Sequence, residues 1–159
     1  MNNIYYCYYE SPLGKLLLTG RERLESLNFP RGTTRVEPGE DWIPSPDRFR
    51  DVLAQLTAYF TGELKAFDLE INARGTRFQE RVWKELVRIP YGQTISYGEL
   101  AKRIGNPNAA RAVGMANGKN PIAVIIPCHR VIGKNGSLTG FGGGLDTKAK
   151  LLDHERSNL

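Results

Sequence analysis

The chain has 159 residues, of which 40% are apolar, and this is enough for a hydrophobic core in one domain or two small ones. Disorder throughout is therefore excluded, and a membrane-spanning helix is not expected because no run of about eighteen apolar residues occurs. The net charge of +5 favours a polyanionic partner without identifying one.

The cysteines and histidines are few and poorly spaced for a metal site. Two cysteines do not make a disulfide framework, and Cys7 has no C-x-x-C partner. Cys128 and His129 are direct neighbours, so we expect no bound metal. The first ten residues lack the basic flank and apolar segment of a secretory signal, and we expect a cytoplasmic protein with both cysteines as thiols.

The first third of the chain predicts short strands at residues 4–10, 15–20 and 24–29, separated by Ser-Pro-Leu-Gly and Thr-Gly turn signals. This spacing is typical of an antiparallel meander. Residues 30–47 contain four prolines and no apolar periodicity, which predicts a long loop.

A helix is predicted from Pro46, because its apolar residues recur every three or four positions on one face until Gly62 stops it. The apolar–polar alternation at 67–71 predicts a last strand, and "NARG" at 72–75 is interpreted as a linker. We therefore expect an α+β protein. A small antiparallel-sheet domain with a helix would occupy residues 1–72, and a mostly helical domain would occupy residues 73–159.

The second part opens with Thr76-x-x-Gln79, the form of a capping box, followed by a helical stripe that ends at Pro90. Its apolar members are Phe78, Val82, Leu86 and Ile89, and Trp83 widens the stripe.

A second capping box, Ser96-x-x-Glu99, predicts a short helix that ends at Gly105. Asn106 is then placed to cap a further helix with Pro107 at its first position. Helix, tight turn and helix within about two dozen residues indicate either a DNA-binding helix-turn-helix or an ordinary helical hairpin.

The second of these helices, "PNAARAVGMANGK", is slim because alanines and glycines dominate it, and only Arg111 and Lys119 carry charge. A reader of the major groove is expected to show several long polar side chains, which are scarce here. A slim helix favours the minor groove, which is roughly 6 Å wide and carries a degenerate sequence code. Arg111 would then enter the base stack; the alternative is a solvated surface arginine.

The apolar run "IAVII" at 122–126 is typical of a buried strand, which Pro127 would end beside Cys128. Cys128 is either a small buried apolar residue or a nucleophile, and the second role needs a base or a positive charge nearby. His129 and Arg130 are candidates for that role. Successive side chains of an extended chain point to opposite sides, so we expect His129 to act through a water molecule.

The imidazole of His129 should in turn be oriented by a carboxylate. The predicted C-terminal helix "TKAKLLDHERS" offers Asp153 and Glu155, and either could instead be a solvated surface acid.

The motifs "IPCHRVI", "ISYGELAKRIGNPNAARAVG" and "NGKNPIAV" closely resemble the O6-alkylguanine-DNA alkyltransferases, also called methylated-DNA-protein-cysteine methyltransferases. The resemblance covers residues 76–155, and "SPLGKLLLTG" extends it more loosely into the first 70 residues. It implies DNA repair by direct, stoichiometric transfer of the alkyl group of O6-alkylguanine, and of O4-alkylthymine, to the protein itself.

The resemblance also implies roles for single residues. Cys128 would be the thiolate that attacks the alkyl carbon, with His129 acting through a water molecule and Glu155, rather than Asp153, holding the imidazole. Asn120 would brace the turn before the active-site strand, and Tyr97 would give a proton to the departing guanine. The alternative for Tyr97 is a core tyrosine.

Further positions match the family's contacts with the flipped nucleotide and the duplex. The Cys128 N–H and the Val131 carbonyl would contact the base edge, and Arg111 would fill the gap in the stack. The loop "GKNGSLTGFGGG" would wall the base pocket, with Phe141 in place of a frequent tyrosine and Gly142 in place of a larger residue. The remaining positions matched to DNA contacts are Tyr97, Gly98, Asn106, Phe78 and Lys134.

The product would be a thioether that no residue is placed to cleave, so one molecule would repair one lesion without a cofactor. The partner would be double-stranded DNA carrying O6-alkylguanine and not a membrane, and the protein would be a monomer able to cluster on DNA. Three other classes compete: a binder of alkylated DNA without transfer, a helix-turn-helix regulator and a cysteine hydrolase. Cys128 argues against the first, the alanine-rich helix against the second, and the lack of any other hydrolase feature against the third.

Overall fold

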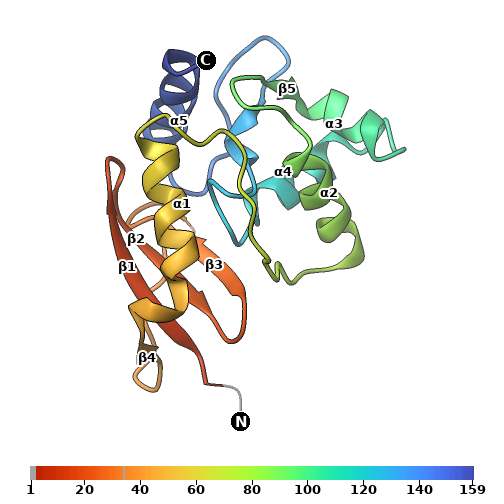
Figure 1. Cartoon of the computed structure of the whole chain (residues 1–159). Coiled ribbons are helices and arrows are strands. Elements are labelled where there is room, and N and C mark those ends of the chain that lie inside the picture. The colour runs from red at the N-terminus through yellow and green to blue at the C-terminus, as the bar shows by residue number, and fades with distance from the viewer. Residues whose placement is uncertain (1–2, 34) are drawn as a thin grey trace.

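The structure, a computed structural model, describes residues 3–33 and 35–159. It places an antiparallel sheet with a helix first and a mostly helical part second, which confirms the expected α+β class (Figure 1). No helix in the described ranges is long and apolar enough to cross a membrane. The elements in chain order are β1 (Tyr5–Ser11), β2 (Gly14–Gly20), β3 (Leu24–Asn28), β4 (Ile43–Pro44), η1 (Pro46–Phe49), α1 (Arg50–Phe60), α2 (Arg77–Val87), β5 (Ile95–Ser96), α3 (Tyr97–Arg103), α4 (Ala110–Gly118), η2 (Cys128–Arg130), β6 (Val131–Ile132) and α5 (Leu145–Ser157).

The N-terminal sheet has the order β3-β2-β1-β4, and its first three strands form the expected antiparallel meander. The β1–β2 turn is closed by Ser11, whose hydroxyl accepts from the N–H of Leu13 at 3.0 Å and donates to the carbonyl of Gly14 at 2.7 Å. Gly14 has a φ of +104°, a conformation that favours glycine. One face of the sheet packs against α1 (Figure 1).

The predicted loop 30–47 contains one feature that the sequence did not indicate. Ile43 and Pro44 form β4, which pairs in parallel with Tyr5 and Tyr6 at the edge of the sheet. Two residues are too few to show an alternating pattern, and proline is tolerated at a sheet edge. Residue 34 of this loop lies outside the described residues.

The predicted first helix is confirmed as η1 followed by α1, and Gly62 follows it with a φ of +85°. The predicted strand at 67–71 is wrong. Only Ile71 makes a bridge, to Leu24, and the N–H of Asn72 donates to the Leu24 carbonyl at 2.8 Å. The side chains of Phe67 and Leu69 are half-buried against the core, so burial without a strand partner produced the alternation.

Helix α2 begins with the predicted capping box: the Thr76 hydroxyl accepts from the N–H of Gln79 at 3.1 Å, and the Gln79 side chain accepts from the N–H of Thr76 at 2.9 Å. Trp83 of the same helix donates its indole N–H to the Ala116 carbonyl at 2.9 Å. Helix α2 therefore supports α4 from behind.

The helix-turn-helix is α3 and α4, and Gly105 ends α3 with a φ of +81° as expected. At the start of α3, the Ser96 hydroxyl accepts from the N–H of Glu99, whereas the Glu99 carboxylate lies beside Arg103. Helix α4 starts at Ala110, so the prediction that Asn106 caps it is wrong. Asn106 instead opens a tight turn, accepting from the N–H of Ala109 at 3.0 Å, with proline at the second turn position.

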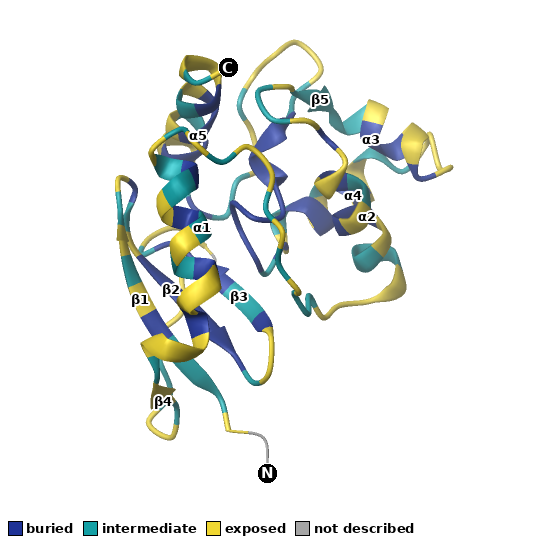
Figure 2. Ribbon diagram, viewed as in Figure 1, coloured by how far each residue is buried: buried dark blue, intermediate teal, exposed yellow. Residues whose placement is uncertain are grey.

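The predicted strand at 122–126 is also wrong, although most of its side chains are deeply buried. The segment is a series of turns, and Val124 has a φ of +71°. Its only ladder-like contacts reach β3: Leu27 donates its N–H to the Pro121 carbonyl, and its carbonyl accepts from the N–H of Ala123. This segment therefore covers the edge of the N-terminal sheet, and one hydrophobic core runs through both parts of the chain (Figure 2).

Candidate active site

Cys128 lies at the start of the short helical turn η2, directly after Pro127, and not at a strand end as predicted. Its side chain is buried, and the residue is 5% exposed. Its N–H donates to the Ile126 carbonyl at 2.8 Å, and its carbonyl accepts from the Asn117 side chain at 3.3 Å. The turn therefore holds the sulfur next to the C-terminal end of α4.

Asn120 braces the turns that precede Cys128. Its side-chain N–H donates to the Ile126 carbonyl at 2.7 Å, and its side-chain oxygen accepts from the N–H of Ile122 at 3.0 Å. Both bonds are buried, so removing the amide would leave the Ile122 N–H without this partner in the core, while the Ile126 carbonyl would keep its bond from the Cys128 N–H.

The sulfur borders a small cavity of about 10 Å³, room for a single water molecule. The cavity reaches the end of α4, but it is far too small for a nucleobase, because the glycine-rich loop after β6 closes it. Gly143 packs against Phe29, and the Phe141 and Phe29 rings lie 5.7 Å apart. A base can therefore enter only if the residues that line this cavity move apart. The cavity is lined by Leu27, Phe29, Asn117, Gly118, Asn120, Ala123, Cys128, Phe141, Gly142 and Gly143.

Burial raises the pKa of the Cys128 thiol to about 11, while a hydrogen bond from Asn120 and the charge of Lys148 pull it downward. Cys128 was expected to react as a thiolate. With the cavity as small as it is here, its side chain is instead a neutral thiol. Since fewer than about one molecule in a thousand would ionise at pH 7 with such a pKa, the thiol must lose its proton to a base as it reacts.

Lys148, which the sequence did not single out, lies fully buried on the loop side of this site. Its ammonium donates to the Val131 carbonyl at 2.5 Å and to the Thr139 carbonyl at 2.8 Å, and lies 5.9 Å from the centre of the Tyr97 ring. Burial lowers its pKa to about 8, against an opposing effect of Cys128. Lys148 is therefore charged at neutral pH and favours ionisation of the sulfur.

Lys148→Met is expected to raise the pKa of Cys128 further and to slow its modification by iodoacetamide, about tenfold for each unit of pKa. Because Lys148 loses its charge as the pH rises through about 8, the difference from the wild type should be largest below pH 8 and shrink above it. The measurement is the modification rate of Cys128 against pH by peptide mass mapping, with Cys7 as the internal reference. A constant ratio of rates across this range would contradict the electrostatic role.

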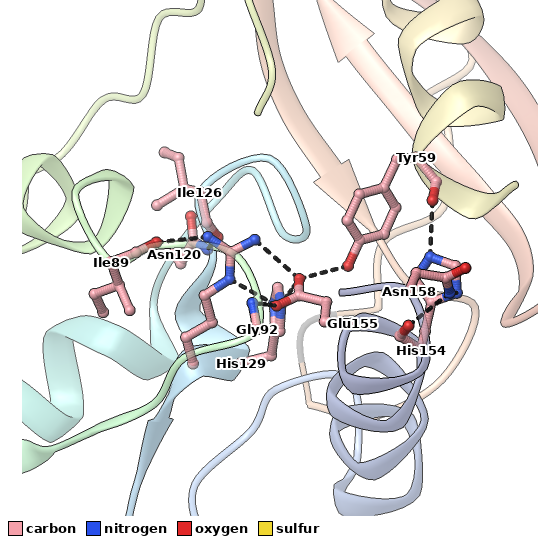
Figure 3. A network of polar contacts seen from close by, with 10 residues as sticks. Tyr59, Ile89, Gly92, Asn120, Ile126, His129, His154, Glu155 and Asn158 are labelled. Carbon is pink, nitrogen blue, oxygen red and sulfur yellow. Dashed lines mark hydrogen bonds and ion pairs between the residues drawn. The ribbon is translucent and has the colours of Figure 1, made fainter. Parts of the chain in front are cut away.

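His129 is fully buried next to Cys128, and its Nε2 lies 2.7 Å from Oε2 of Glu155 (Figure 3). Burial lowers the pKa of His129, although Glu155 acts in the opposite direction, so the ring is neutral at pH 7. An ionised carboxylate can only accept, so the ring proton must lie on Nε2. Nδ1 is then a free lone pair, and no described residue hydrogen-bonds to it.

Glu155 is the centre of this network (Figure 3). Besides His129, it accepts from the Arg130 guanidinium at 2.9 Å through both oxygens, from the Tyr59 hydroxyl at 2.7 Å and from the N–H of Gly92 at 3.1 Å. Burial would raise the pKa of Glu155, but His129 and Arg130 outweigh it and hold the pKa well below its usual range. Arg130 is thus committed to Glu155 and does not serve the sulfur as the sequence had allowed.

The choice between the two acids of the C-terminal helix is clear in the structure. Asp153 is exposed and lies 4.0 Å from Arg156 on the same helix, whereas Glu155 is completely buried against His129. Tyr59 and Gly92, which complete the acid's shell, come from distant parts of the chain that carry no local signal of this role.

Tyr97 stands at the start of α3 and is half-buried, with its ring against Gly114 of α4. Its hydroxyl donates to the Thr139 carbonyl at 3.0 Å, so its present partner is the loop that closes the cavity. The phenol would become free to meet another acceptor when that loop moves. The Cys128 N–H and the Val131 carbonyl, predicted to contact a base edge, likewise have internal partners in Ile126 and Lys148.

The remaining residues predicted to contact DNA are exposed or half-buried. Arg111 is exposed on α4, Asn106 is exposed in the turn before it, and Lys134 is exposed in the loop after β6. Phe78 and Gly98 are half-buried in the first turns of α2 and α3. A methyl group on Gly98 would meet only the Ser96 hydroxyl at 3.9 Å, so this backbone is open to close approach. No group of three or more metal-binding side chains gathers within the described ranges.

Two family models match the chain. The 6-O-methylguanine DNA methyltransferase DNA binding domain matches residues 77–157, and the ribonuclease-like domain of the same family matches residues 4–73. The curated methylated-DNA–protein-cysteine methyltransferase of Methanosarcina acetivorans is 53% identical over 155 residues, covering 97% of this chain and 99% of that protein. The protein of the same name from Mycobacterium bovis is 54% identical, covering 97% and 93%.

Solved structures agree with these sequence matches. The crystal structure of Mycobacterium tuberculosis O6-methylguanine methyltransferase superposes with a TM-score of 0.90 at 52% identity, covering 98% of this chain and 94% of that one. The crystal structure of Mycobacterium tuberculosis OGT in complex with DNA also gives a TM-score of 0.90, at 53% identity, covering 97% and 94%.

Proposed function

The chain belongs to the O6-methylguanine DNA methyltransferase family, and from this premise we propose that it repairs duplex DNA by transferring the alkyl group of O6-alkylguanine to its own Cys128. The observation that carries the proposal is a buried thiol beside a neutral histidine, whose proton position is set by a buried, ionised glutamate. This arrangement lies at the end of an exposed, slim helix suited to a minor groove.

In the proposed reaction the sulfur attacks the alkyl carbon, so that an S–C bond forms as the C–O6 bond of guanine breaks. The thiol proton leaves toward Nδ1 of His129, through one water molecule, because Nδ1 is the nitrogen left free by Glu155. Guanine leaves with the bonding electrons and gains a proton that Tyr97 supplies. The products are a thioether on Cys128 and an unmodified guanine.

The neutral thiol of the closed site is compatible with this role. Ionisation is coupled to base entry: when the glycine-rich loop moves, Lys148 still faces the sulfur and His129 accepts the proton. Phe141 and Gly142 would then form part of the base pocket, and the Cys128 N–H and Val131 carbonyl would meet the base edge. A resting thiol also reacts less with stray electrophiles.

The alkylated base is stacked inside a duplex, so the nucleotide must rotate out before the sulfur can reach it. Arg111, which is exposed on α4, would fill the vacated place in the stack. We propose Gly98, Asn106, Phe78 and Lys134 as further contacts with the duplex. O4-alkylthymine presents the same kind of alkyl–oxygen bond and is proposed as a second substrate.

The thioether has no carbonyl for water to attack, so each molecule acts once and needs no cofactor.

We further propose that residues 1–72 support the site and residues 73–159 carry the reacting and DNA-contacting groups. The protein would act as a cytoplasmic monomer that can cluster on DNA, in a compartment that keeps both free cysteines reduced.

The decisive experiment is intact-protein mass measurement after mixing the full chain with a duplex that contains one O6-methylguanine. We expect a gain of one methyl group that saturates at one equivalent, located on the Cys128 peptide, and no gain with the unmodified duplex. Continued turnover beyond one equivalent, or methylation of another residue, would contradict the proposal.

A further inference from the structure

One apolar side chain on α4 has no role in the proposed chemistry and yet is largely exposed to solvent. Met115 is 67% exposed, more than any other large apolar residue of the described chain except Leu159. It follows Arg111 by four residues, so the two side chains lie one above the other on the same side of the helix.

The buried side of α4 fixes which way these two residues face. Val113, Ala116 and Asn117 are buried, and Trp83 of α2 donates to the Ala116 carbonyl from behind the helix. In a helix of 3.6 residues per turn, the direction opposite Val113 and Asn117 is occupied by Arg111, Met115 and Gly118. The outward face of α4 therefore presents one cation and one long apolar chain.

The other residues on this face of α4 have short side chains or none. The neighbouring positions of α4 are alanine or glycine, so a surface that approaches the helix touches Arg111 and Met115 before it touches other side chains. A single exposed methionine on an ordinary surface needs no explanation. Here, however, it lies beside the arginine assigned to the base stack.

We propose that Met115 is a further duplex-contacting residue, which makes an apolar contact in the minor groove on one side of the nucleotide whose place Arg111 fills. The proposal rests on the repair function proposed above and adds a positioning residue to it. Apolar side chains, methionine among them, are used as wedges at base steps by minor-groove proteins. The methionine side chain is unbranched and adapts to an irregular surface.

The spacing along the helix suits this role. Four residues advance the helix by about 6 Å, and successive base pairs are about 3.4 Å apart, so Met115 would lie about two base pairs from Arg111 if the helix follows the groove. At that distance it contacts sugar and base edges beside the lesion without entering the alkyl pocket. Since a thioether is at most a weak acceptor, the contact would support duplex binding rather than select a base.

The test compares Met115→Ala and Met115→Leu with the wild type on three probes. These are an unmodified duplex for binding, the same duplex with one O6-methylguanine for transfer, and free O6-methylguanine base for transfer without DNA. Val87→Ala is the matched control, because Val87 is an exposed apolar residue, 55% accessible, at the end of a different helix.

We expect Met115→Ala to weaken duplex binding and slow duplex repair about tenfold, the effect of losing most of one buried methionine side chain. Transfer from the free base should stay within about twofold of the wild type, and Met115→Leu should restore most of the duplex activity because leucine keeps similar apolar volume. Val87→Ala should match the wild type on all three probes.

Two results would overturn the proposal: wild-type duplex binding and repair by Met115→Ala, or an equal loss on the duplex and on the free base, which would indicate a disturbed pocket. If the wild type transfers no methyl group to itself, the proposed function fails instead. Binding of the unmodified duplex by the variants would still report on Met115 in that case.

Discussion

Cys128→Ala is expected to accept no methyl group from an O6-methylguanine duplex, even at long reaction times and with the protein in excess. The variant removes the thiol of a residue that lines the loop-covered cavity and directly precedes His129 of the His129–Glu155 pair. The cavity grows by about one sulfur atom, so the fold should persist with a modest loss of stability. The measurement is the intact mass after reaction, together with the melting temperature and duplex affinity of the variant.

The chain supplies a matched control in its other cysteine. Cys7 is also buried, and burial raises the pKa of its thiol to about 11 as well, but it lies in β1 and faces the N-terminal core. Cys7→Ala should therefore retain one methyl group per molecule at the wild-type rate. Methylation of Cys128→Ala, or loss of transfer in Cys7→Ala, would show that the acceptor has been assigned to the wrong residue.

Glu155→Gln is expected to lower the free energy of unfolding more than any of the other substitutions. It should also slow methyl transfer more than any of them except Cys128→Ala. The amide leaves the buried Arg130 guanidinium without its counter-charge, and breaking a buried ion pair costs about 3–5 kcal/mol of unfolding free energy. It also no longer fixes the ring proton of His129 on Nε2, and we expect transfer to slow about a hundredfold. Denaturant unfolding and single-turnover rates measure the two effects separately.

Asp153→Asn is the control, because Asp153 lies two residues away on the same helix but is exposed. It should change stability by less than about 0.5 kcal/mol and leave transfer unchanged. If Glu155→Gln were as stable and as active as Asp153→Asn, the buried network would have no part in either property.

Glu155 also sets an expected response to acid. Its pKa is depressed in the folded state, so its contribution to stability is complete above the ordinary glutamate pKa and is lost as the pH falls below it. The lowered pKa of His129 acts in the same direction, because unfolding releases an imidazole that binds a proton more readily. The wild type should therefore lose stability from about pH 6 downward, and Glu155→Gln should show a weaker loss below about pH 4.

Short-range sequence signals predicted most of the helices and where the motifs of the site lie along the chain. Capping at Thr76 and the glycines at 62 and 105 act within a few residues, so their effect can be seen in the sequence alone. The failures come from tertiary contacts. The segment 122–126 is as apolar as a buried strand, yet Asn120 closes it into turns by bonding to both of its ends.

In the site, too, some residues could be predicted from the sequence, whereas others depend on tertiary contacts. Cys128 and His129 could be identified from a short motif, and the resemblance separated Glu155 from Asp153. Lys148 could not be identified, because a lysine in an amphipathic helix is normally solvated, and only the path of the loop after β6 buries it. Tyr59 lies in the other half of the chain, 96 residues before the carboxylate that it contacts.

The contact between Tyr59 and Glu155 links the evolution of the two halves of the chain. The tyrosine hydroxyl reaches across from α1, and the backbone carbonyl of the same residue accepts from His154 on α5. The N-terminal half therefore influences the reaction indirectly, because Tyr59 helps to orient Glu155, which in turn binds His129. Replacing this half by an unrelated domain would remove a hydrogen-bond donor from the Glu155 carboxylate. Substitutions in the two halves are therefore constrained by each other.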